Sequence, residues 1–537
     1  MPLPDASVPW PPRDFEPYRN KVAIWDAWWT GDPELLAAAY GGSPGTPQAA
    51  FSPLQYAGGV GGRLARFWWG RPPSQGEPQA KAHVPLASDI ARASADLLFS
   101  EPLEATADAQ ATTDYLDVVL GDGMQAKLLE AAEIAAGLGG VYLRPAYNQL
   151  VANAAWIEAI SPDHVIPEWI SGHLRAGTLW RVLERTSDRT VVRHLERHEP
   201  GWTVHGLYVG SDSELGRPVP LTEHEETAHL ADFVNADGAV ETGYPGLALR
   251  YVPNMRPSKP FRRDPLLAPL GQSDLADIEG LLDQLDEVHS SWMRDIRLAK
   301  GRIIVPENYL EVLGPGKGAR FDPDREAYSA LPGFLDANPG EHNMITVQQF
   351  AIRVGEHEAT ERNIITQALR TAGYSAQTFG DGVDATTMAT ATEVVARERR
   401  SFITRNRKIQ YWRPELVALL EAYLAIDAYA YGRPPLDPTG LAVEFADSVS
   451  EDQITVAQTV QTLRAAGAMS VETAIREVHP DWTDVQVAEE RERILDDERR
   501  VAPADLARTI GNLGDDDEDP DDEPDGPPDV EDERSGS

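Results

Sequence analysis

The sequence GQSDLADIEGLLDQLDEVHSSWMRDIR, residues 271–297, predicts a helix that is unusually long for a compact domain. Ser273 is a suitable N-cap, and apolar residues recur at helical spacing as far as Ala299. Asp274 and Asp277 would then lie in the first turn, where carboxylates complement the helix dipole. At 1.5 Å per residue the segment would span roughly 40 Å, whereas globular helices average about 11–12 residues. Its apolar stripe consists of Leu275, Ile278, Leu282, Leu285, Trp292, Ile296 and Ala299.

The chain beyond this helix alternates between helical and irregular patterns. Residues 300–354 predict strands and loops, and residues 355–372 predict another helix. A glycine-containing loop at 374–385 leads into a second long helical stretch at 386–431, which contains Pro414. Because a proline removes one helical hydrogen bond and clashes with the preceding turn, we predict a kink at Pro414.

The chain before residue 271 changes from helical to strand-like patterns. Helices are predicted at 14–29, 32–40, 83–99 and 123–138, and short helices also at 451–512. Strands are predicted at 141–147, 156–160, 190–198, 202–209, 302–305, 344–347 and 441–445. Glu199-Pro200-Gly201 is a predicted hairpin turn. The sequence as a whole predicts an α+β fold that is mostly helical.

Composition indicates an acidic globular protein. The 537 residues suggest three or four domains, and 42% hydrophobic with 25% charged residues are ordinary globular values. The absence of cysteine excludes disulfides and thiol chemistry. A net charge of −38 gives a surface that repels nucleic acid and anionic lipid. Residues 515–537 hold 13 acids and one base, which predicts a disordered tail.

No segment indicates a membrane span, a secretory signal or a catalytic motif. The longest uncharged apolar stretch, 134–143, is too short to cross a bilayer, and the start lacks a signal pattern. Gly41-Gly42-Ser43-Pro44-Gly45 lacks the strand that a nucleophile elbow requires, and 314–318 lacks a phosphate-loop frame. We interpret His194, His198 and His205 as solvated strand residues rather than a metal site. No cofactor and no metal are expected.

A basic segment at 393–413, EVVARERRSFITRNRKIQYWR, contrasts with the acidic remainder. On a helical wheel its basic face consists of Arg397, Arg400, Arg407 and Lys408. This face could contact DNA, or it could pair with acids of a neighbouring subunit or domain. The strongly negative net charge favours the second interpretation.

The order of these parts resembles portal proteins of tailed bacteriophages, in particular the long, non-contractile-tailed type from GC-rich hosts. The resemblance covers most of 83–495. It rests on HVPLASDIARASADLLFSEP (83–102), LGGVYLRPAYN (138–148), ISPDHVIPEW (160–169), the segment at 271–297, and LRAAGAMSVETAIREVHPDWTDVQVAEERERI (463–494).

The resemblance implies a portal architecture. Its parts would be a wing (1–265), a stem helix (266–299), a clip (300–354), a second stem helix (355–372), a channel loop (373–386), a long kinked helix with the return strand of the wing (387–446), a crown (447–512) and an acidic tail (513–537). The loop residues expected to line the channel are Thr378, Phe379, Gly380, Asp381, Gly382, Val383 and Asp384.

The resemblance also implies a role and partners. A dodecameric ring would occupy one capsid vertex of the virion, after assembly in the host cytoplasm, and double-stranded DNA would pass through it during packaging and ejection. Implied partners are the terminase large subunit, the major capsid and scaffold proteins, and a head-completion or adaptor protein. In this family the terminase, not the portal, hydrolyses ATP, and no membrane is involved. Two alternatives are another structural virion protein and, because 13 tryptophans and many carboxylates suit sugar binding, a carbohydrate-active enzyme.

Overall fold

The computed structural model consists of two units, residues 1–448 and 449–537. The structure describes residues 3–6, 8–41, 81–149, 151–186, 189–298, 353–380, 391–445, 453–479, 482 and 486–496, together with four short strands between 302 and 348. The fold is α+β, and helices form about half of the described residues, with far fewer residues in strands; the expectation of an α+β fold is confirmed, and that of a mostly helical chain holds only to this extent.

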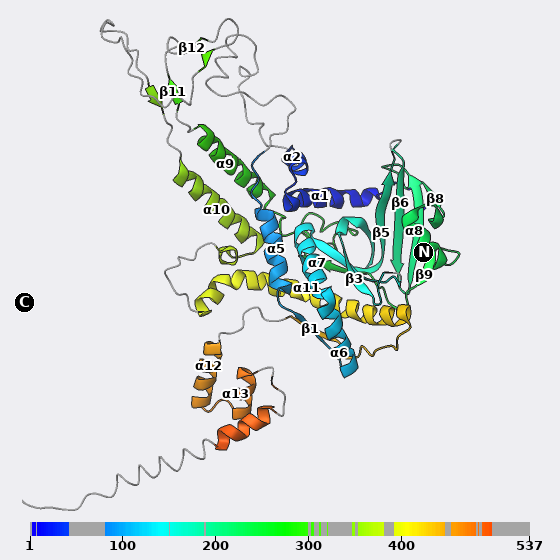
Figure 1. Ribbon diagram of the computed structural model, residues 1–537, viewed down its shortest axis with the longest axis vertical. Helices are drawn as coiled ribbons and strands as arrows, with labels where there is room; N and C mark the ends of the chain where they lie inside the picture. Colours follow the sequence, from blue (N-terminus) through cyan, green and yellow to red (C-terminus); the bar gives the residue numbers. More distant parts are fainter. Residues whose placement is uncertain are drawn as a thin grey trace, which may run out of the picture. The chain divides into compact units, whose positions relative to one another are not determined.

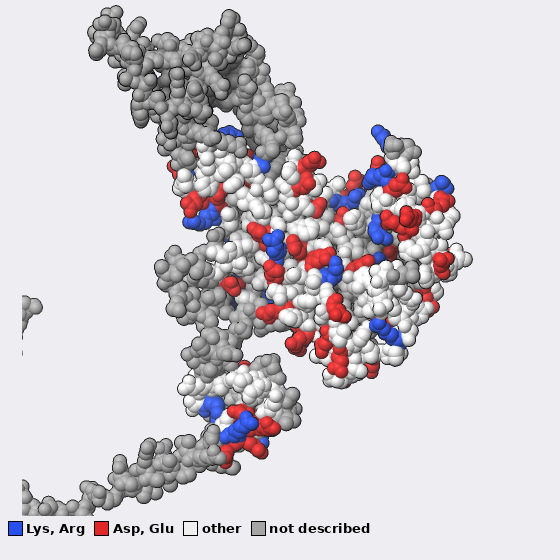
Figure 2. Space-filling model, viewed as in Figure 1, with Lys and Arg blue, Asp and Glu red and all other residues white. Residues whose placement is uncertain are grey.

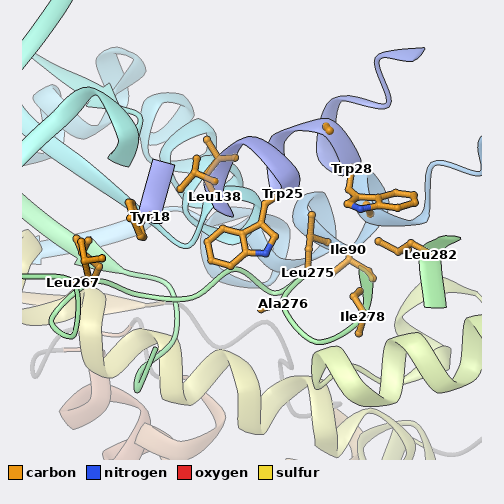
Figure 3. Packing of buried hydrophobic residues seen from close by; sticks show 14 of the residues in the cluster. Tyr18, Trp25, Trp28, Ile90, Leu138, Leu267, Leu275, Ala276, Ile278 and Leu282 are labelled. Atoms are coloured by element: carbon orange, nitrogen blue, oxygen red, sulfur yellow. The ribbon is translucent and has the colours of Figure 1, made fainter. Parts of the chain in front are cut away.

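The first helices of the chain form part of the main core. They are η1 (Arg13–Phe15), α1 (Glu16–Thr30), α2 (Pro33–Gly41) and α5 (Leu86–Phe99). Trp25 and Trp28 of α1 are buried against Ile90 of α5 and the segment that contains Leu275 and Ile278 (Figure 3). Aromatic side chains bury large apolar areas, so α1 is a structural part of this unit although it lies outside the family resemblance.

A second core forms around the next helices. α6 (Gln110–Val119), η2 (Leu120–Met124) and α7 (Gln125–Leu138) pack with the C-terminal half of α11 (Ala391–Tyr431), where Trp412 and Leu419 are buried. Gly139, with φ of +94°, ends α7 in the left-handed conformation, one residue after the predicted helix end at 138. β1 (Leu103–Thr106), which the sequence did not predict, pairs antiparallel with β15 (Ala442–Phe445).

The strands form a large antiparallel sheet and a small one (Figure 1). The large sheet has the order β4 (Val165–Ile170), β5 (His173–Arg185), β6 (Val191–Glu199), β7 (Trp202–Gly210) and β8 (Arg217–Val219), and β9 (Ala239–Glu241) also pairs with β7. The small sheet has the order β10 (Arg250–Pro253), β2 (Gly140–Ala146) and β3 (Trp156–Ile160). The connections contain η3 (Pro162–His164), η4 (Leu221–Glu223), α8 (Glu225–Ala228) and η5 (His229–Asp232).

The predicted hairpin at Glu199-Pro200-Gly201 is confirmed, because Glu199 pairs with Trp202 across the turn. The predicted solvation of the histidines on β6 is wrong. His194 and His198 are 2% and 3% exposed, and His205 of β7 stacks on His194. Their strands alternate, but both faces of β6 are covered, so polarity did not indicate exposure here.

Two long helices lie side by side in Figure 1. They are α9 (Glu279–Leu298) and α10 (Val354–Ala372), and between them the chain forms β11 (Arg302–Ile304), β12 (Glu311–Val312), β13 (Ala319–Arg320) and β14 (Thr346–Gln348). β11 pairs antiparallel with β14, and β12 with β13. The short helix η7 (Ala376–Phe379) follows α10 and precedes α11.

The first long helix begins later than predicted, at Glu279 rather than after Ser273. The Ser273 hydroxyl donates to the carbonyls of Ala136 and Gly137 at 3.0 and 2.6 Å. It therefore satisfies the C-terminal carbonyls of α7 instead of capping α9. Residues 274–278 fold as turns, with Asp277 at φ of +72°.

The second unit is small and helical. Its elements are α12 (Gln453–Ala465), α13 (Val471–Val478) and a helix at 486–496. Ser470 caps α13 by accepting from the amide of Thr473 at 3.1 Å. Arg491 pairs with Glu472 at 3.5 Å, and Val487 is buried, so the last helix packs on α13. The tail from residue 515 lies outside the described residues.

Candidate functional site

A buried ion pair joins α11 to the segment before α9. Lys408 and Asp274 have side chains that are each 1% exposed, and their Nζ–Oδ2 distance is 2.5 Å. Lys408 Nζ also donates to the Ser94 hydroxyl of α5 at 2.6 Å and to Tyr374 Oη at 3.1 Å. Tyr374, which follows α10, donates to Asp274 at 2.7 Å, and Asn254 donates to the other oxygen at 2.8 Å.

The pKa values reflect the low polarity of this site. Burial lowers the pKa of Lys408, and the negative charge of Asp274 opposes that shift. Burial and the same carboxylate raise the pKa of Tyr374 well above its usual value. One polar cluster therefore holds four segments that are far apart in the sequence. We call Ser94, Asp274, Tyr374 and Lys408 the buried polar cluster.

The chain between α10 and Gly380 is fastened to α11 by hydroxyl groups. Ser401, which is fully buried, accepts from the Ser375 amide at 3.0 Å, and its hydroxyl lies 2.8 Å from that of Thr378. Thr404 donates to the Gly373 carbonyl at 2.7 Å. We call Ser401 and Thr404 the loop clamp.

Left-handed glycines bound the fastened segment. Gly373 has φ of +98°, ends α10, and redirects the chain toward α11. Gly380 has φ of +79° and ends η7. Phe379 packs edge-to-face on Tyr374, with ring centroids 6.3 Å apart. Of the predicted channel-loop residues, Thr378 is thus bonded to α11, Phe379 packs on Tyr374, and Gly380 ends η7.

The remaining predicted channel-loop residues are Asp381, Gly382, Val383 and Asp384, and they lie outside the described residues. The helix kink is also a prediction that stands untested. α11 runs through Pro414 as one helix. The neighbouring Glu415 is largely buried, and its burial raises the pKa of its carboxyl group.

The four predicted basic-face residues do not share one exposed face. Arg400 and Arg407 are exposed, and Arg407 donates to the Arg256 carbonyl. Lys408 and Ser401 are both buried. The charge of Lys408 is tolerated inside the protein because it forms an ion pair with Asp274. The side chain of Arg397 is outside the described part of the helix.

Paired side chains hold α9 and α10 antiparallel. His289 lies 3.0 Å from Glu361, and Asp295 near the far end of α9 lies 3.1 Å from His357. Asp295 also pairs with Arg353 at 3.0 Å, and these two partners lower the pKa of its partly buried carboxyl group. These pairs connect α9 and α10 at two levels along their length and keep the two helices side by side.

The histidine cluster of the large sheet is neutral at ordinary pH. Burial lowers the pKa of both His194 and His205 to about 3, and nearby positive groups add to the shift. The His194 Nε2 and His205 Nδ1 atoms are 3.2 Å apart. No group of three metal-ligating side chains occurs among the described residues. The glycine motifs at 42–45 and 314–318 fall outside them, and no helix in the described ranges could cross a membrane.

Sequence reasoning missed the buried contacts of Asp274, Tyr374 and Ser401. Asp274 resembled an ordinary acid in the first turn of a helix. Ser401 and Lys408 are buried like Ile409 and Trp412 of the same helix. Polar residues that occur among the apolar residues of a helix can indicate buried polar contacts, and this was the signal available in the sequence. Their partners could not be identified from spacing alone.

These features describe a structural protein in which polar clusters join long helices to a loop. Residues 220–504 match the family described as "Phage portal protein, SPP1 Gp6-like". The match covers more than half of the chain, and the protein therefore belongs to this phage portal family. The family is structural and non-enzymatic, which sets aside the carbohydrate-active alternative.

Solved structures give further likenesses. The neck of a native GTA particle, computed with C12 symmetry, matches at 14% identity and a TM-score of 0.38, covering 83% of this chain and 98% of the other. The neck of an empty GTA particle, computed with C6 symmetry, matches at 16% identity and a TM-score of 0.35 with the same coverage. Among curated proteins none matches significantly.

Proposed function

We propose that this portal-family protein forms a closed ring at one vertex of a phage capsid, where double-stranded DNA enters and leaves. The carrying observation is the antiparallel pair α9–α10, followed by a loop that the loop clamp fastens to α11. In a ring, each copy would contribute one such pair to the wall and one loop to the lumen. Closure by rotation requires a heterologous interface that repeats around the axis.

The parts of the proposed architecture keep the boundaries expected from the sequence. The wing would comprise residues 1–265, the stem 266–299 and 355–372, the clip 300–354, the channel loop 373–386, the helix and return strand 387–446, and the crown 447–512. Support comes from the two strand pairs that lie between the stem helices, and from β15, which returns to pair with β1.

The acidic surface suits a channel through which DNA slides. Contacts with phosphates supply much of protein–DNA affinity. A net charge of −38 per chain repels phosphates and so lowers the affinity for DNA. Figure 2 shows acidic side chains spread over the visible face of the first unit, with basic ones interspersed. We infer that DNA meets a weakly binding wall.

The proposed partners follow from this role. The clip would dock the terminase large subunit during packaging and a head-completion or adaptor protein afterwards. The wing would face the major capsid and scaffold proteins, and twelve copies are the proposed ring size. The ring would be part of the virion after assembly in the host cytoplasm.

Electron microscopy of the purified full-length protein tests the proposal. We expect end-on views of rings with a central opening wide enough for a DNA duplex. The loop after Gly380 should border its narrowest part. Particles without an opening, or with that loop on the outer rim, would refute the proposed role.

A further inference from the structure

A cleft in the first unit is lined by an excess of arginine. Its walls come from α1, from β2 and β3 with the η3 turn, and from β5 and β6. The charged residues in its lining, apart from histidines, are Arg19, Arg144, Arg181, Arg185, Glu158 and Glu196. Within a chain of net charge −38, this local excess of positive charge is unusual. It concentrates anions at one point of a surface that otherwise repels them.

Two of the four arginines are already paired. Arg144 binds Glu158 at 2.8 Å and also contacts Glu196, so its single positive charge offsets one of the two acids of the cleft. Arg185 pairs with Asp212. Two histidines line the cleft, His164 and His194; His194 has a pKa lowered to about 3 and therefore adds no charge near neutral pH.

Arg19 and Arg181 form no ion pair or hydrogen bond with any described residue. The Arg19 guanidinium lies over the Trp180 ring, 5.3 Å from its centroid. Stacking occupies the face of a guanidinium and leaves the N–H groups on its edge free to bind a planar or tetrahedral oxyanion. Arg181 is exposed on the adjacent position of β5.

Two donors in the same wall are buried without an acceptor in the described part of the chain. They are the indole Nε1 of Trp180, a residue that is 8% exposed, and Nε of Arg19. Neither atom is accessible to solvent, so an anion in the cleft would meet the terminal Nη groups of Arg19 rather than these two donors.

We propose that this cleft is a binding site for an oxyanion, a phosphate or carboxylate group held by Arg19, which stacks on Trp180, and by Arg181. The stacked guanidinium supplies the fixed donors, and the exposed Arg181 supplies the charge at the entrance. The oxyanion could be free or carried by an acidic peptide. Both sources present the same chemistry to the site.

Isothermal titration calorimetry of the full-length protein tests the proposal with two probes, inorganic phosphate and a hexaglutamate peptide. Saturable binding of either probe is expected. Arg181→Gln and Arg19→Gln should each weaken it by about tenfold or more, because each removes a charge-assisted hydrogen bond. Arg217→Gln, at an exposed position of β8 outside the cleft, is the matched control and should bind as the unmodified protein does.

The probe that binds more tightly identifies the source of the oxyanion. Arg181 is exposed, so its replacement leaves the fold intact, and circular dichroism with a thermal melt verifies this for both cleft variants. Arg181→Lys keeps the charge but loses the planar fork, so intermediate weakening is expected. Absence of saturable binding by both probes, or equal affinity in Arg181→Gln and Arg217→Gln, would overturn the proposal.

Discussion

At the scale of single residues, Lys408 is the clearest case of a charge whose role depends on a distant partner. Its helical position placed it on a basic face with Arg407, yet it is buried against Asp274. Sequence spacing describes the neighbours along one helix. It carries no information on a carboxylate 134 residues away in the chain.

Replacement of Lys408 by methionine should destabilise the first unit by about 3–5 kcal/mol, because Asp274 would stay buried without its counter-charge. Urea unfolding followed by circular dichroism measures the change. Arg400→Met, at an exposed position of the same helix, is the control and should shift stability by about 0.5 kcal/mol or less. Equal effects of the two substitutions would show that the buried polar cluster contributes nothing specific.

The neutral histidine cluster should make the protein acid-sensitive. His194 and His205 have folded pKa values of about 3, below their ordinary value of 6.5, so the unfolded chain binds protons first as the pH falls. Stability should therefore decrease from about pH 6.5 toward pH 3, by up to about 1.4 kcal/mol per pH unit for each histidine.

Thermal melts between pH 7.5 and 5 measure this slope. His194→Gln should flatten it, whereas His173→Gln, at an exposed position of β5, should leave it unchanged. If the slope is identical in all three proteins, other groups cause the acid sensitivity.

At the scale of elements, local sequence patterns predicted an element correctly where its bounds depend on nearby residues rather than on distant contacts. The predictions at 83–99, 123–138 and 156–160 match α5, α7 and β3 to within three residues, because caps, glycines and alternation are encoded there. β5 was missed because its burial does not alternate regularly: five successive residues within it are buried. The start of α9 was wrong because Ser273 binds the end of α7 instead.

The loop clamp gives a prediction for the segment at 373–380. Ser401→Val should remove two hydrogen bonds to that segment and speed its amide hydrogen exchange by about tenfold. Thr366→Val on α10 is the control, since its hydroxyl donates only to the Arg362 carbonyl of its own helix. Exchange in 373–380 that is equally fast in both variants would show that the clamp does not hold the segment.

At the scale of the whole molecule, we expect the acidic C-terminal tail to be dispensable for assembly. Residues 515–537 carry 13 acids and only one base, and such a composition cannot bury enough apolar surface to offset the entropy of ordering. Truncation after Gly514 should therefore leave assembly unchanged, as judged by size-exclusion chromatography. Loss of the assembled form on truncation would assign the tail a structural role.

The most direct test of the account is the mass of the native protein in solution. Mass photometry of the purified full-length chain should show one discrete assembly of about twelve times the 58.8 kDa subunit, since each copy presents the same heterologous interface. A single species at 58.8 kDa across the micromolar range would contradict ring formation, and with it the proposed role as a DNA channel.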